Sequence, residues 1–283
     1  MNTKKLYVVT LSIVAIMIAF VMGFTFMPLE VFAEEAGEIY YNSEIRPFLF
    51  SARNETLNYT RKEVLIDTTM SPKTPNYYDA DSVLKNGCAA VAGGIIVGYY
   101  DITLENIIPN FSSFLKRGGN IVYKPIDSNI QNLMNDLYFR MKVNTTGAGA
   151  TEEQFKNGLN EYVVDKGYNI TYRGYGQGSS IDYNAIANSF KNGKSVALFV
   201  TMSNLVTNLE IGDTNLTMTT TEYNANHILI ANGIKKVRYF NGSNVIRTDT
   251  YLSVSSGLEH FPTGYIWLEG TTAVNDIVGV EIY

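Results

Sequence analysis

The sequence predicts an α+β protein in which helices come first and strands follow. Between residues 88 and 167, apolar side chains recur with helical periodicity. After residue 167, short runs rich in β-branched and aromatic residues are separated by Gly, Asn and Asp, as is typical of strands. The two patterns do not alternate regularly along the chain, which argues against the repeated strand–helix units of a parallel-sheet fold.

The first 33 residues have the features of a secretory signal peptide. Two lysines precede an apolar stretch over residues 6–26, and a small-residue cleavage site ends at Ala33. The stretch is also long enough to span a bilayer as an uncleaved anchor. We therefore expect a secreted, extracellular protein whose only membrane contact, if the segment is retained, is this N-terminal segment.

The remaining chain is expected to comprise an extension and one large domain. Residues 34–75, with a β-like run at 63–69 and turn signals at Pro72 and Pro75, would form an N-terminal extension or a removable prosegment. Residues 76–283 would form the domain. The net charge is −5 and basic residues do not cluster, which argues against a nucleic-acid partner.

The periodicity assigns the individual elements in chain order. Helices are predicted at residues 89–100, 104–115, 128–141, 152–164 and 180–194. The start of the fourth helix is the best defined, because Thr151 and Gln154 match a capping box. Strands are predicted at residues 168–173, 195–200, 227–234, 248–254, 264–269 and 276–282.

The only cysteine, Cys88, lies at the start of the first predicted helix, in NGCAAVAGGIIVGYYD. Secreted cysteines usually form disulfides, which one cysteine cannot do within its own chain. Asn86 is the expected N-cap, which would place the thiol in the positive field of a helix N-terminus and favour the thiolate. The alternative is an inert thiol packed as a small hydrophobic group.

The two histidines are candidate bases for this thiol. His227 lies in NHILIANGI, where strand alternation places it on the same face as Leu229 and Ala231. From a strand edge, its imidazole could reach a helix N-terminus and withdraw the thiol proton. The alternative is a structural histidine in a half-buried strand. His260, in a turn-rich stretch, is expected at the surface or at a cleft rim.

These stretches together resemble the papain superfamily, in particular secreted bacterial peptidases related to streptopain and to bacteriocin-processing (double-glycine) peptidase domains. In that group Gly-Cys opens a central Ala-rich helix, and the histidine begins a strand that runs into a glycine, here Gly233. The segments 151–173 and 185–200 also resemble the family, so the likeness covers about residues 77–268. It implies a papain-like two-lobe fold: an N-terminal helical lobe with a central cysteine-bearing helix, packed on a C-terminal antiparallel β-rich lobe.

The chain departs from the family pattern at two supporting positions. Ser256 stands where the family has the Asn or Asp that orients the histidine, and its hydroxyl oxygen could accept the imidazole N–H. Asp249 is a less favoured substitute. Ser82 stands where the family has its oxyanion-hole glutamine. Beside the cysteine's own N–H, the second donor would be Asn86, Asn76 or Ser82, of which Asn86 is preferred.

The expected function is hydrolysis of a peptide or protein substrate by a secreted cysteine peptidase. Cys88 would attack the amide carbonyl, and His227 would transfer the protons through an acyl-enzyme intermediate. Two alternatives remain: a catalytically inactive surface module that binds a peptide, and an acyltransferase or amidase acting on isopeptide or cell-wall amides. No cofactor is expected, and metal catalysis is disfavoured because the sequence has no HExxH or CxxC motif.

Overall fold

A computed structural model describes residues 39–41, 52–79, 84–178, 180–270 and 273–283. The predicted signal peptide, residues 1–33, lies outside the described residues, as does most of the adjoining stretch up to residue 51. Contacts divide the chain into Met1–Ile39 and Tyr40–Tyr283, and the second unit holds the elements described below. No helix in the described ranges is long and apolar enough to cross a bilayer.

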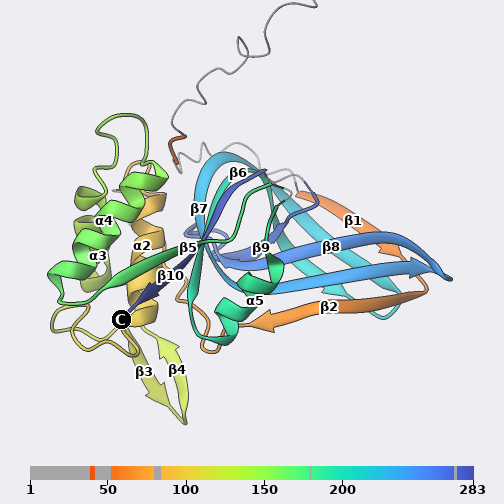
Figure 1. The fold of residues 1–283 in the computed structure, drawn as a ribbon, viewed down its shortest axis with the longest axis horizontal. Helices are drawn as coiled ribbons and strands as arrows, with labels where there is room; N and C mark the ends of the chain where they lie inside the picture. The colour runs from red at the N-terminus through yellow and green to blue at the C-terminus, as the bar shows by residue number, and fades with distance from the viewer. Residues whose placement is uncertain (1–38, 42–51, 80–83, 179, 271–272) are drawn as a thin grey trace, which may run out of the picture. The chain divides into compact units, whose positions relative to one another are not determined.

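An eight-stranded antiparallel sheet dominates the described chain (Figure 1). Its strands are β1 (Ala52–Asn58), β2 (Arg61–Thr69), β5 (Ile170–Gly174), β6 (Ser195–Ile211), β7 (Asn215–Asn241), β8 (Asn244–Ser255), β9 (Thr263–Trp267) and β10 (Ala273–Ile282). The strand order is β1-β7-β8-β9-β6-β10-β5, and β2 also pairs with β7. Because β7 pairs with β1, β2, β6 and β8, it connects most of the sheet.

Four helices accompany the sheet within the described residues. They are α2 (Cys88–Tyr100), α3 (Ser128–Arg140), α4 (Glu152–Asp165) and α5 (Tyr183–Lys191). Figure 1 shows α2, α3 and α4 grouped together, and α2 also packs on β7. The capping box of Thr151 and Gln154 is confirmed, with the hydroxyl accepting the Gln154 N–H at 3.1 Å.

The two-lobe architecture implied by the papain resemblance is wrong. Strands account for 44% of the structure and helices for 22%, and the described chain begins with strands, not with a helical lobe. β1 and β2, from the predicted extension, belong to the same sheet as the C-terminal strands. The apolar runs revealed only the buried centres of the strands, whereas polar flanking segments extend β6 and β7 to 17 and 27 residues.

Two further element predictions also need correction. The helix expected at residues 104–115 does not form: the segment consists mostly of turns and leads into a separate hairpin of β3 (Phe114–Arg117) and β4 (Asn120–Tyr123). Asn106 and Asn110 adopt positive φ angles of 59° and 54°, which are incompatible with an α-helix. The helix expected at residues 180–194 is shorter, because the Asp182 side chain caps it one residue before α5 begins.

Candidate active site at the start of α2

The helix that carries Cys88 is buried on all sides. All thirteen residues of α2 are buried, because the helix lies between α3, α4 and β7. Glycines permit this close packing: a Cβ on Gly98 would lie 2.6 Å from the Tyr77 ring, and one on Gly94 would lie 2.9 Å from Met134 Cγ. The chain thereby holds Cys88, the first residue of the helix, in a fixed position against the sheet.

The helix start differs in detail from the prediction. Gly87 occupies the N-cap position and provides no side-chain cap. Asn86 is not the N-cap: it has a φ of 57°, and its side-chain amide donates to Asn144 Oδ1 at 2.7 Å. The amide is therefore directed toward Asn144, so the structure gives no geometric support to its predicted part in an oxyanion hole.

The Cys88 thiol is enclosed beside the strand that carries His227. Its residue is 3% exposed, and the backbone N–H of Ile228, the residue after His227, favours the thiolate form. Burial raises the pKa of Cys88 to about 12, although the N–H groups of Ile228, Ala89 and Cys88 itself favour the thiolate. The predicted lowering of the thiol pKa by the helix N-terminus is therefore wrong for this conformation, because desolvation exceeds the stabilisation from the N–H groups.

His227 has one ring nitrogen fixed and one ring nitrogen unpaired. It lies on β7 opposite Val200 of β6, is 1% exposed, and its Nε2 lies 2.7 Å from the Ser256 carbonyl oxygen. A carbonyl oxygen can only accept, so Nε2 carries the proton and Nδ1 is the free acceptor. Nδ1 is buried without a hydrogen-bond partner in the described structure.

The environment keeps the imidazole neutral. Burial lowers the pKa of His227 to about 4, although its hydrogen bond to the Ser256 carbonyl favours the protonated ring. With the thiol pKa raised and the imidazole pKa lowered, both groups are uncharged at neutral pH in this closed conformation. His227 Nδ1 is a free basic nitrogen and forms no hydrogen bond with the Cys88 thiol in this conformation.

Ser256 contacts His227 through a different atom from the one predicted. The serine hydroxyl donates to the Phe261 carbonyl and accepts the Leu258 N–H at 3.1 Å, so it is engaged within its own turn. The backbone carbonyl of Ser256 holds the imidazole. A backbone acceptor fixes the tautomer without contributing a formal charge.

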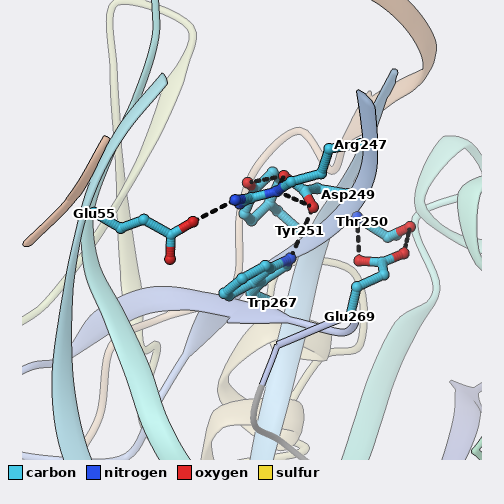
Figure 2. Close-up of polar contacts among 7 residues, drawn as sticks. All are labelled: Glu55, Arg247, Asp249, Thr250, Tyr251, Trp267 and Glu269. Carbon is cyan, nitrogen blue, oxygen red and sulfur yellow. Dashed lines mark hydrogen bonds and ion pairs between the residues drawn. The ribbon is translucent and has the colours of Figure 1, made fainter. Parts of the chain in front are cut away.

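Asp249 belongs to a separate cluster on the sheet. It is fully buried, and Figure 2 shows its carboxylate surrounded by three donors: Arg247, Tyr251 and Trp267. Arg247 Nε lies 2.7 Å from both carboxylate oxygens, the Tyr251 hydroxyl donates at 2.7 Å and Trp267 Nε1 at 3.1 Å. Arg247 also pairs with Glu55. Because these contacts occupy the carboxylate, Asp249 does not orient His227.

The other predicted candidates do not join the cysteine and histidine. Asn76 accepts the Ser255 hydroxyl through Oδ1 at 2.8 Å, and His260 is exposed. Ser82 lies outside the described residues. No group of three or more His, Cys, Asp or Glu side chains suited to a metal ion occurs among the residues that the structure describes.

Sequence reasoning missed a buried polar cluster that fixes the chain ahead of α2. Thr74 Oγ1 lies 2.9 Å from Ser255 Oγ, and the Asn232 amide donates to Thr74 at 3.3 Å. The Ser253 hydroxyl donates to Asn232 Oδ1 at 2.9 Å. The cluster ties the segment before the cysteine to β7 and β8. Its only signal in the sequence is Asn232 inside an otherwise apolar strand.

Comparisons with protein-family models, with curated proteins and with solved structures give no significant match to the chain. A functional assignment therefore depends on the residues and geometry of the candidate site.

Proposed function

We propose that the chain is a cysteine peptidase in which Cys88 is the nucleophile and His227 the proton-transfer group. The observation that carries the proposal is the His227 ring: Nε2 is held by the Ser256 carbonyl, and Nδ1 is an unpaired acceptor. A buried nitrogen without a partner is costly, which is why such groups often belong to functional sites. The N–H of Ile228, the residue that follows this histidine, favours the thiolate form of Cys88.

The proposed reaction uses these two groups in sequence. His227 Nδ1 first takes the thiol proton, and the Cys88 thiolate then attacks the scissile carbonyl carbon. The ring returns that proton to the leaving amine nitrogen, the C–N bond breaks, and a thioester remains on the sulfur. Water then attacks the thioester with Nδ1 accepting its proton, which releases the acid and regenerates the thiol. The Ser256 carbonyl keeps Nε2 protonated throughout.

The closed conformation requires a local opening before substrate can react. Because Cys88 is 3% exposed and His227 1% exposed, a peptide carbonyl reaches the sulfur only after neighbouring groups move. Opening also readmits water, which reduces the desolvation that raises the thiol pKa and lowers the imidazole pKa. The proposal therefore places the reactive ion pair in the opened, substrate-bound state.

Cleavage of a denatured protein or a mixed peptide library by the purified chain tests the proposal. Cys88→Ala and His227→Gln should each abolish cleavage while far-UV circular dichroism stays unchanged. His260→Gln is the matched control, because the only other histidine is exposed and should be dispensable. Cleavage by Cys88→Ala at the wild-type rate would overturn the assignment.

A second candidate function is a catalytically inactive module that binds a peptide. The complete burial of both groups and the resulting neutral pair favour it, since active cysteines generally lie in exposed, electropositive surroundings. A binding module would cleave none of the library peptides. The wild-type protein and Cys88→Ala would bind the same peptide with equal affinity. Turnover that depends on Cys88 would exclude this candidate.

A further inference from the structure

The hairpin formed by β3 and β4 extends away from the rest of the described chain (Figure 1). Its two strands pair only with each other. The turn between them contains Gly118 and Gly119, with φ angles of 55° and 84°, as a two-residue hairpin turn requires. No other atom lies within 4 Å of where a Cβ would sit on either glycine, so the tip is unpacked.

The base of the hairpin, in contrast, is firmly anchored. The Asp101 carboxylate at the end of α2 accepts the Ser113 N–H at 2.6 Å and the Ser113 hydroxyl at 2.8 Å. The Lys124 N–H donates to the Ser113 carbonyl at 2.8 Å, which joins the two ends of the hairpin. An isolated hairpin is only marginally stable in water, so these contacts explain how a tip without packing partners stays formed.

The tip combines apolar and basic side chains. Leu115 and Val122 are cross-strand partners and are 41% and 42% exposed. Lys116 and Arg117 are also exposed, and neither forms an ion pair with a described residue. Residues 106–126 contain three basic residues and no acidic residue, although the whole chain has a net charge of −5.

We propose that this hairpin tip docks on an anionic lipid surface. Basic side chains are attracted to anionic headgroups, and adjoining apolar side chains can enter the boundary between headgroups and acyl chains. Two tip cations are too few to hold an extended nucleic acid against the acidic remainder of the chain. A purely electrostatic partner would also leave the exposed Leu115–Val122 pair without a role.

Fluorescence from a probe at the tip tests the proposal in the full chain. An environment-sensitive fluorophore is attached to Asn120→Cys in a Cys88→Ser background, with Asn184→Cys on α5 as the reference position. Vesicles of phosphatidylcholine alone are compared with vesicles that also contain phosphatidylglycerol. Any membrane association of the N-terminal segment is common to both labelled proteins, so it cannot produce a difference between the two probe positions.

Only the tip probe, and only with phosphatidylglycerol, should shift to the blue and be quenched by spin-labelled lipid. Lys116→Gln with Arg117→Gln should lower the docking constant about thirty-fold, since each basic residue contributes about fivefold. The matched control pair, Lys73→Gln with Lys191→Gln, removes two exposed lysines elsewhere and should have little effect.

Three results would overturn the proposal. The first is an equal response to neutral and anionic vesicles. The second is an equal loss of docking in the tip pair and the control pair of charge variants. The third is a combination of two observations: the double variant Leu115→Ser with Val122→Ser responds to vesicles as strongly as the unsubstituted tip, and soluble heparin gives the same response. Together these would indicate a general polyanion site.

Discussion

Acidification should destabilise the protein through His227, and the size of the effect follows from its burial. The folded-state pKa of about 4 lies below the ordinary value of 6.5, so the unfolded chain binds the proton more tightly. The neutral, buried ring therefore contributes stability above pH 6.5, and this contribution is lost as the pH falls through the interval down to about 4. Between pH 7 and pH 4, the loss amounts to about 3 kcal/mol.

Urea unfolding of wild type and His227→Gln, followed by the fluorescence of the single tryptophan, measures this contribution. Glutamine can donate to the Ser256 carbonyl but cannot titrate in this range. Burial raises the pKa values of Asp101, Glu269 and Asp276, which contributes in the opposite direction. These carboxyl groups are present in both proteins and cancel in the difference.

Wild type should therefore lose about 3 kcal/mol more than His227→Gln between pH 7 and pH 4. Equal losses in the two proteins would refute the reasoning, because they would mean that the imidazole is no harder to protonate when folded than when unfolded. A smaller loss in wild type than in the variant would give the opposite sign and would imply a protonated ring in the folded state.

Three further substitutions test the packing around the site and the sheet by chemical denaturation. Asp249→Ala should lower the free energy of unfolding by about 3–5 kcal/mol, because it leaves buried donors without an acceptor. Asp213→Ala, at an exposed position, should lower it by under about 0.5 kcal/mol. Equal effects would contradict the structural role of the Asp249 cluster. Gly98→Ala should cost about 1–3 kcal/mol through contact with the Tyr77 ring, and a stabilised variant would show that α2 is not held that closely. Thr151→Ala should cost about 1 kcal/mol, and no change would indicate that the capping box is not formed in solution.

The sequence predicted local elements correctly where one short-range signal dominated. The capping box at Thr151 placed the start of α4, and the apolar run after Cys88 placed α2 to within one residue of its observed start. Strand alternation likewise placed His227 on a strand. In each case a few neighbouring side chains determine the conformation, so the pattern is visible without tertiary contacts.

The architecture could not be predicted from the sequence, because it depends on pairing between strands that are far apart in the chain. β1 is mostly exposed and polar, and it is a strand because it pairs with residues 215–221 of β7. The helix expected at 104–115 fails because Pro109 in its interior breaks a helix, and because Asp101 binds Ser113 and turns the chain back. Neither the remote pairing nor this contact has a periodic signature.

The chemistry of the candidate site was only partly visible in the sequence. The sequence singled out Cys88, His227 and Ser256, and the structure brings the histidine and serine into hydrogen-bond contact. The sequence could not show that Ser256 contacts His227 through its backbone carbonyl, because every residue has that group. It also could not show the direction of the thiol pKa shift, because the opposing effects of burial and backbone N–H groups depend on three-dimensional packing.

The proposed proton transfer from the Cys88 thiol to His227 Nδ1 is tested most directly by the rate at which iodoacetamide alkylates Cys88 at pH 7, followed by intact mass. If Nδ1 accepts the thiol proton, His227→Gln should slow alkylation by about a hundredfold or more, while His260→Gln should leave the rate unchanged. Equal rates in wild type and His227→Gln would show that the sulfur reacts without the imidazole, and the proposed catalytic pair would be contradicted.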